Sequence, residues 1–519
     1  MSSITSHSPR SAARVNRRSL LMGGAAISAA LATLDFPVAF AQDGRRDHLI
    51  LDLGSEPGTL DPATTYDADG WSVVHSIYDS LLQYSADGAV TPLLAESFTL
   101  IDPLTYRVVL RSGITFHNGE SLDSRAIEVS IAHITAEETA SQVAGNFSVI
   151  ESVEIVDDLT ADLHLSAPAP WLPSQIAAWL CLLPPEASGK DDFFSNPVGT
   201  GPYRFESIAP GDRVSLTANS DYFAESPKGQ PIAERVDYRF VSDATTRVAD
   251  LLSGTAHIIR NVPIDQIGAV ESSGNRVLQT PISGCAFIRI PTDVEPFSDV
   301  RVRQALNYAV DVDAIIGALL AGHGQRLANL FVPGGLGYDA GLAPYAYDPD
   351  MSRRLLAEAG YPDGFDTSLD ATITERADIV EAIAAMLTDA GIRTTVNRLD
   401  LALFNSGDYW LGTDPAASPL RFASWRPLFD PHTLLSLVVS NSGFLSRHDN
   451  PSVQELIDAS SVESDPGARA AIGLQLGRVL HDEPAAIYLY SLTSATGEAS
   501  ELPEWTQRAD DYLIPTFAS

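Results

Sequence analysis

The sequence predicts an α/β protein that is built from more than one domain. Short apolar segments typical of strands alternate with segments whose apolar residues recur at helical spacing, and the alternation continues to the end of the chain. The chain has 519 residues, which is more than one hydrophobic core usually serves. Its hydrophobic content of 45%, with glycine and proline spread throughout, is typical of an ordered globular protein.

The predicted elements are interleaved along the chain. A turn-rich passage at residues 56–62 follows the first strand. Residues 299–320 are predicted to be helical because their apolar side chains recur three and four positions apart. The other predicted elements are strands at 48–53, 106–110, 153–155 and 161–165 and helices at 71–83 and 124–135.

The first 41 residues have the composition of an export signal. Four arginines precede an apolar stretch at residues 20–34, and Ala39 and Ala41 mark a cleavage site before Gln42. The pair Arg17 and Arg18 resembles the twin-arginine export signal, and an ordinary secretory signal that contains two arginines is the alternative. Because the apolar stretch is shorter than the ~20 residues that span a bilayer, we expect no permanent membrane anchor.

Removal of residues 1–41 leaves 478 residues with a net charge of −37, because the segment carries four arginines and one aspartate. Nucleic acid and anionic membrane surfaces are therefore not expected as partners. Cys181 and Cys285 are the only cysteines, and neither lies at the cleavage site to accept a lipid. We expect a freely diffusing protein in the periplasm, where a disulfide between these two residues is allowed but not predicted by their spacing.

Several short motifs occur in a fixed order between residues 48 and 495. They are EPGTLDP at 56–62, IYDSLL at 77–82, PLLAES at 92–97, LRSGITFHNGE at 110–120, GTGPY at 199–203, VRVRQALNYAVD at 300–311, DNP at 449–451 and AIYLY at 486–490. Together they resemble the large extracytoplasmic solute-binding proteins of peptide, nickel and related importers, solute-binding family five. The stretch TTYDA at 64–68 looks especially like that of dipeptide-binding members.

The resemblance implies a two-lobed α/β fold of the periplasmic-binding-protein type, type II, with an extra inserted subdomain. We expect lobe I at 42–84, 200–285 and 495–519, the inserted subdomain at 85–199 and lobe II at 286–494. The chain would cross between the lobes near Ser283 and Gly284 and again near Ser494, and these two crossings would form a hinge.

The resemblance also implies a function. Such proteins close around a solute, here a peptide or peptide-like molecule, and the closed form is recognised by the permease of an ABC importer, which works with ATPase subunits. We expect a monomer that needs neither a cofactor nor a metal ion.

The passage FASWRPLFDP at 422–431 resembles the lobe II loop that lines the cleft of peptide binders. Those relatives carry an aspartate three residues after the tryptophan, which pairs with the amino terminus of the ligand. Here Leu428 stands at that distance from Trp425, so this anchor is missing or has moved to Asp430. Arg426 suggests a ligand carboxylate or phosphate, and a salt bridge to a nearby acid is the alternative. A helix cap before Pro431 is the alternative for Asp430, and core packing is the alternative for Trp425.

Other candidate ligand-binding residues follow the Leu-Asp-Pro turn at 60–62 or just precede the tryptophan loop, and Arg260 and Asn261 are a further pair of candidates. Aromatic faces hold an extended ligand without demanding one sequence, but each of these side chains has core packing as its alternative role. The candidates are Tyr66, Asp67, Trp71, Phe404, Tyr409, Trp410, Arg260 and Asn261.

The sequence contains no nucleophile elbow, HExxH zinc motif, phosphate-binding loop or paired-cysteine metal site. We therefore predict a binding protein and not an enzyme, with an exported hydrolase as the alternative from another class. Within binding proteins, the cargo alternatives are a metal chelate, glutathione, an opine or another amino-acid conjugate. A sensory protein that hands its ligand to a receptor is a further alternative.

Overall fold

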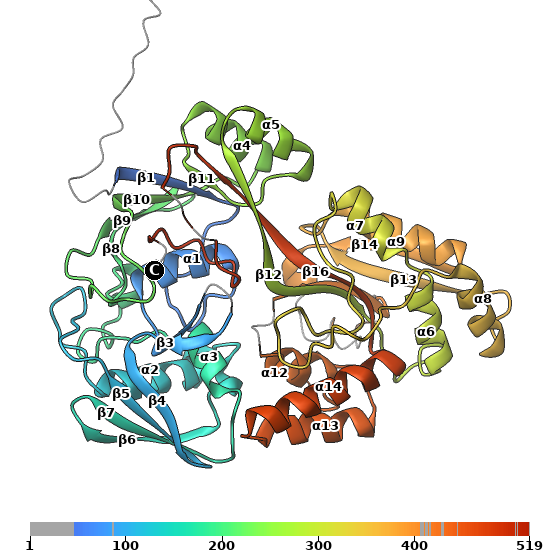
Figure 1. Ribbon diagram of the computed structural model, residues 1–519, viewed down its shortest axis with the longest axis horizontal. Coiled ribbons are helices and arrows are strands. Elements are labelled where there is room, and N and C mark those ends of the chain that lie inside the picture. The colour runs from blue at the N-terminus through green and yellow to red at the C-terminus, as the bar shows by residue number, and fades with distance from the viewer. Residues whose placement is uncertain are drawn as a thin grey trace, which may run out of the picture.

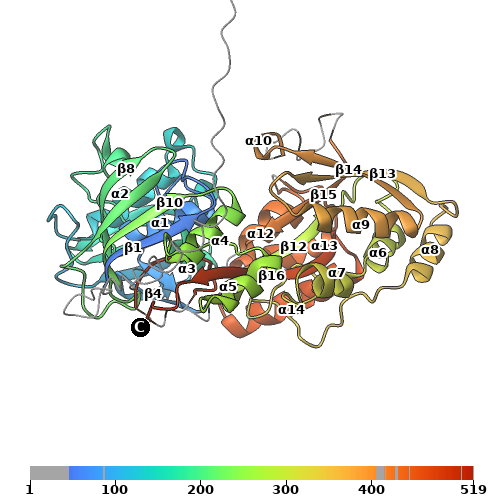
Figure 2. The ribbon, with the colours of Figure 1, turned by 90° about the horizontal axis from the view of Figure 1, so that it is seen from above.

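The computed structural model describes residues 46–85, 88–404, 409, 414, 417–426, 430–443, 445–503, 505 and 507–517. The predicted export signal at residues 1–41 lies outside this range. Two lobes lie side by side, each with its own hydrophobic core, and two long strands join them (Figures 1 and 2). The predicted two-lobed α/β fold is therefore confirmed.

One 10-stranded sheet extends through both lobes in the described part of the chain. The strands stand in the order β14-β13-β15-β12-β16-β11-β1-β10-β9-β8. Their bounds are β1 (Arg46–Leu53), β8 (Tyr203–Ala209), β9 (Arg213–Ala218), β10 (Ala233–Phe240), β11 (Ile258–Ile259), β12 (Arg276–Arg289), β13 (Phe365–Thr372), β14 (Ile392–Leu399), β15 (Leu420–Trp425) and β16 (Ala486–Glu498). We use lobe I for the half built on β1 and β8–β11 and lobe II for the half built on β13–β15.

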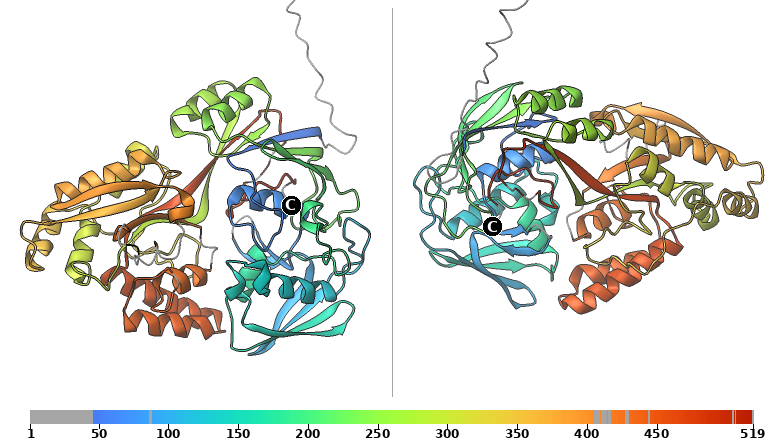
Figure 3. Two further views of the ribbon diagram at one scale, coloured as in Figure 1. Left: turned by 180° about the vertical axis from the view of Figure 1, so that it is seen from behind. Right: turned by 45° about the horizontal axis from the view of Figure 1, so that its top comes forward.

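β12 and β16 cross from lobe I to lobe II as an antiparallel pair (Figures 1 and 3). Their ladder runs from Arg276 opposite Glu498 to Arg289 opposite Ala486, and its register shifts between Pro281 and Cys285. Gly284 lies in this irregular segment, where a Cβ atom would stand 3.0 Å from the carbonyl oxygen of Trp425. Such an irregularity lets a strand bend. The crossing predicted near Ser283 and Gly284 falls within it.

Lobe I carries a second, smaller sheet with its own core. Its strands stand in the order β4 (Ala95–Asp102), β5 (Thr105–Leu110), β7 (Thr160–Leu165) and β6 (Ile150–Asp157), and a two-stranded sheet of β2 (Leu82–Tyr84) and β3 (Val90–Pro92) lies beside it. The helices of lobe I are α1 (Ala68–Ile77), α2 (Arg125–Thr135), α3 (Leu172–Trp179), α4 (Ala244–Ser253) and α5 (Ile267–Ser272). The apolar side chains of α2 and α3 cover the smaller sheet.

The lobe II sheet is covered on both faces. One hydrophobic cluster joins it to α6 (Val300–Tyr308), α7 (Val312–Leu319), α8 (Pro349–Glu358) and α9 (Ala377–Asp389). A second cluster joins the opposite face to α10 (Leu401–Phe404), α12 (His432–Leu434), α13 (Pro451–Val462) and α14 (Pro466–Asp482). β15 contributes to both clusters, with Leu420 and Phe422 on one face and Ala423 on the other.

The predicted strands are confirmed by β1, β5, β6 and β7, and the helix predicted at 124–135 is confirmed by α2. The helix predicted at 71–83 is wrong in extent. Asp67 caps α1 by accepting a hydrogen bond from the Gly70 amide at 2.8 Å, and the helix ends where Tyr78 becomes extended. The Gly199 backbone packs so closely there that a Cβ atom would lie 2.1 Å from the Ile77 oxygen. The helix predicted at 299–320 is two helices, because Asp311 caps the start of α7.

Cys181 and Cys285 are both buried and both free. They belong to different hydrophobic clusters, one in each lobe. The question of a disulfide, which the sequence left open, is therefore answered against pairing.

Candidate ligand-binding site between the lobes

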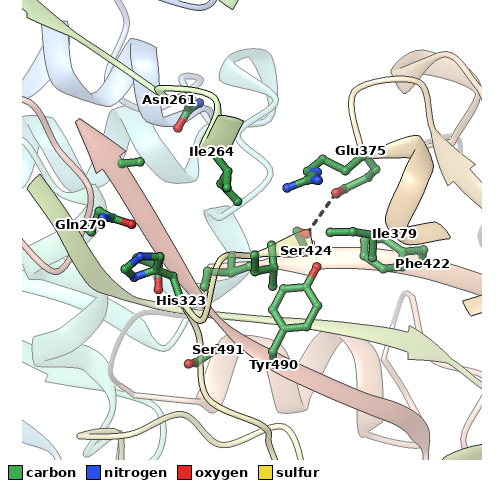
Figure 4. A pocket seen from close by; sticks show the side chains of 15 residues that line it. Asn261, Ile264, Gln279, His323, Glu375, Ile379, Phe422, Ser424, Tyr490 and Ser491 are labelled. Atoms are coloured by element: carbon green, nitrogen blue, oxygen red, sulfur yellow. Dashed lines mark hydrogen bonds between the residues drawn. The ribbon is translucent and has the colours of Figure 1, made fainter. Parts of the chain in front are cut away.

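A cavity of about 290 Å³ lies between the lobes, beside the strands that connect them (Figure 4). Asn261 and Ile264 reach it from lobe I, and Glu375 and Ile379 reach it from lobe II. Its volume is near the lower end of the range for small-molecule sites. The other described lining residues are Gln279, Leu320, His323, Arg376, Phe422, Ser424, Tyr490, Ser491, Leu492, Thr493 and Ala495.

The floor of this interlobe cavity is set by the alternation of side chains along β15. Phe422 and Ser424 point into the cavity. Ala423 and Trp425 point to the opposite face, where they pack with the cluster of α12–α14. The cavity therefore has a largely apolar floor with one exposed hydroxyl, that of Ser424.

Glu375 carries the carboxylate of the cavity. It stands just before α9, and its oxygen accepts a hydrogen bond from the Ser424 hydroxyl at 3.3 Å (Figure 4). Burial raises the pKa of Glu375 above its ordinary value, although the Ser424 bond and the charges of Arg398 and Arg426 oppose this effect. The site thus holds an acid whose charged form is poorly stabilised by the protein alone.

Arg426 connects the two lobes electrostatically. It follows β15 in lobe II, and its guanidinium lies 2.8 Å from a carboxylate oxygen of Asp511, which is in the C-terminal segment of lobe I. Asp511 also pairs with Arg260 at 2.9 Å, and Arg260 in turn pairs with Asp69 at 2.6 Å. Burial acts to raise the pKa of Asp511, but the two arginines, together with hydrogen bonds from Ser494 and Gln507, hold the pKa below its ordinary value. Arg426 itself remains 34% exposed, so part of its guanidinium is accessible.

The lobes also touch through the inserted subdomain. The Trp171 ring stacks on the His432 ring with centroids 4.0 Å apart, and the Thr433 hydroxyl donates to the Gln175 side chain at 3.0 Å. Burial lowers the pKa of His432 to about 4, so this imidazole is neutral at pH 7. These contacts join the two lobes where α3 lies against α12.

Among the predicted residues of lobe I, Asn261 is the one whose side chain lines the interlobe cavity. Arg260 is buried in the ion-pair network described above. Trp71 donates to the Thr65 carbonyl oxygen at 2.7 Å and packs edge-on against Trp179. Tyr66 donates to the Ala63 carbonyl oxygen at 2.8 Å. Asp67 serves as the cap of α1.

The predicted residues of lobe II divide among three places. Phe404 and Tyr409 lie against the Arg421 guanidinium, whose carbon is 5.9 and 4.4 Å from the two ring centroids. Asp430 binds Arg469 through both oxygens, at 2.5 and 3.1 Å, and accepts from the backbone amide of residue 432. Trp410 and Leu428 lie outside the described residues. Trp425 packs on the face of β15 opposite the cavity, and Arg426 pairs with Asp511 of lobe I.

Sequence reasoning missed most of the polar cavity lining, above all Glu375, His323 and Gln279. These residues come from three separate stretches of the chain, and none stands in a motif. Among the described residues there is no cluster of histidine, cysteine and carboxylate side chains suited to a metal ion. In the same part of the chain, no helix has the length and apolar character required to cross a membrane.

Two lobes joined by a pair of strands, with a small cavity lined from both, define the class of solute-binding proteins. Residues 89–445 match the family "Bacterial extracellular solute-binding proteins, family 5 Middle". The chain belongs to this family, whose members serve ABC importers.

A relative agrees with this assignment, and solved structures share the fold. The glutathione-binding protein GsiB of Pectobacterium atrosepticum is 30% identical over 394 residues, which cover 74% of each chain. The binding protein AgaA of A. tumefaciens R10, solved with agropinic acid, superposes with a TM-score of 0.77 at 25% identity and covers 90% of this chain and 97% of its own. NikA of Brucella suis, solved with Fe(III)-EDTA, superposes with a TM-score of 0.80 at 23% identity. The match covers 90% of this chain and 98% of the NikA chain.

Proposed function

We propose that this chain is the substrate-binding component of an ABC importer and that it captures a small peptide-like solute in the interlobe cavity. The observation that carries the proposal is the lining of the cavity by both lobes. A solute that contacts Asn261 of lobe I and Glu375 of lobe II at once binds the closed form more tightly than an open one. Binding therefore shifts the population towards the form that a permease recognises.

Among peptide-like solutes, the size of the cavity favours a compact amino-acid conjugate, such as glutathione or an opine, over a long peptide. About 290 Å³ accommodates a small solute. The relatives GsiB and AgaA are described as binding glutathione and agropinic acid, and both compounds belong to this class. Asp430 is engaged by Arg469, which fits the loss of the usual anchor for a peptide amino terminus on this loop.

The proposal includes export to the periplasm through the signal at residues 1–41 and binding without chemical conversion of the solute. The family assignment supports both. Release of ligand to a permease would then require only that the lobes separate.

Native mass spectrometry of the mature protein, purified without denaturation, tests this function. We expect a mass increment that is lost on denaturation and a released molecule that contains an amino-acid unit. Ser424→Phe should fill the floor of the cavity and abolish the increment, whereas Ser207→Phe, on the exposed face of edge strand β8, should retain it. A released molecule without any amino-acid unit, or chemical turnover of added glutathione, would show that the proposed function is wrong.

A further inference from the structure

Glu375 is a half-buried acid that faces the interlobe cavity (Figure 4). Its side chain is bordered by the buried apolar residues Ile379 and Phe422 and by the ring of Tyr490. A carboxylate in such surroundings is costly unless a positive charge stands opposite it.

The neighbouring arginines are already engaged. Arg376 pairs with Asp378 and donates to the carbonyl oxygen of Leu319 at 2.6 Å. Arg426 pairs with Asp511. Within the described ranges, no arginine, lysine or histidine forms an ion pair with Glu375 within 4.0 Å.

Arg398 comes near Glu375 in a different way. It donates at 2.5 Å to the backbone oxygen of this residue and not to its carboxylate. The Ser424 hydroxyl is thus the hydrogen-bond donor that the described residues offer to the carboxylate. One neutral donor at 3.3 Å does not replace a counter-charge.

We infer that Glu375 is the counter-charge for a protonated amine of the bound solute. The inference rests on the proposed function, because it concerns the same cavity. An ammonium group placed between Glu375 and Ser424 supplies the direct ion pair that neither Arg398 nor Arg426 makes with this carboxylate. The amino-terminal anchor is then moved from the tryptophan loop to the segment before α9. The solute is then a primary or secondary amine, such as an amino-acid conjugate with a free α-amino group.

The stability of the empty protein separates this role from a structural one. Since burial disfavours the charged form of Glu375, Glu375→Gln should leave the empty protein at least as stable as the wild type. If the charge of Glu375 stabilised the fold, the substitution would instead lower the free energy of unfolding of the empty protein.

Binding of glutathione and tri-alanine, each compared with its N-acetylated form, tests the inference by titration calorimetry. We expect the wild type to bind at least one free amine and to lose that binding on acetylation. Glu375→Gln should weaken the same binding by at least about tenfold. Glu381→Gln, an exposed acid on α9 outside the cavity, is the matched control and should bind as the wild type does.

Equal binding of a free and an acetylated probe, or unchanged binding by Glu375→Gln, would overturn the inference and leave the proposed function intact. A wild-type protein that binds neither probe in either form would refute the proposed ligand class and the inference with it. Destabilisation of empty Glu375→Gln relative to Glu381→Gln would also overturn the inference, because it would assign the charge to the fold.

Discussion

Replacement of Glu498 by glutamine should make the stability of this protein less sensitive to pH. Glu498 ends β16 in lobe I and is completely buried, and its partner Arg276 lies 3.0 Å away and is 39% exposed. The other carboxylate oxygen is buried without a hydrogen-bond partner among the described residues. Burial raises the pKa of Glu498 to about 7, against the opposing charge of Arg276.

The magnitude follows from linkage between protonation and folding. In the unfolded chain the carboxyl group loses its proton near its ordinary pKa of 4.5, whereas in the folded chain it keeps the proton up to about pH 7. Between these values the folded state holds more protons, so the free energy of unfolding falls as the pH rises. At about 1.4 kcal/mol per pH unit, the loss amounts to about 3 kcal/mol and is complete above pH 7.

Urea denaturation of the wild type and of Glu498→Gln at pH 4.5 and pH 8 measures this effect. The variant lacks the ionisable group, so its stability relative to the wild type should rise by about 3 kcal/mol between the two pH values. Subtracting the wild type removes the contribution of the other titrating groups. Glu501→Gln, an exposed acid three residues further on, should show no such change. A pH-independent difference for Glu498→Gln would refute the reasoning.

Three further predictions concern buried charges, lobe contacts and thiols. Lys228→Met should destabilise the protein by about 3–5 kcal/mol in urea denaturation, because it leaves the buried Asp79 unpaired, and adding Asp79→Leu should recover part of the loss. Arg426→Ala should cost below about 1 kcal/mol of stability, because Arg426 is partly exposed and Asp511 keeps its pair with Arg260. The same variant should increase the radius of gyration of the empty protein in X-ray scattering, and an unchanged radius would contradict a role in holding the lobes together. Burial raises the pKa of Cys181 and of Cys285 to about 12, so both thiols should be unreactive in the folded protein. A thiol reagent should therefore label two thiols only after denaturation. If no thiol were labelled in the denatured protein, a disulfide would have formed.

Local patterns predicted those elements whose boundaries are set locally. The start of α2 and the period-two strands β5 and β7 follow from side-chain spacing alone. The end of α1 does not, because it depends on contact with Gly199, which is more than 120 positions away in the sequence. The boundary between α6 and α7 at Asp311 could have been predicted from the sequence, because an aspartate that caps the next helix is a local signal.

The candidate site was predicted less completely because its residues meet only through the tertiary fold. Asn261 was a candidate that no motif supported, and its side chain lines the cavity, whereas Arg426 reaches the opposite lobe. Glu375 could not be predicted from the sequence, because the residues that surround its carboxylate belong to β15 and β16, which are distant in the sequence. In the sequence it is one of 67 acidic residues.

The position of the cavity couples solute binding to the hinge. Gln279 of β12 and Thr493 of β16 both line the cavity, and they lie next to the point where the ladder between these strands loses its regular register. A bend at that irregular segment moves Asn261 and Glu375 apart, because they belong to different lobes. Contacts of one solute with both residues therefore oppose opening of the lobes. The free energy gained by closure is the difference between the binding free energy of a solute that contacts both lobes and that of a solute that contacts one. The ion pair of Arg426 with Asp511 acts in the same direction without a solute, so the balance between open and closed forms should depend on both.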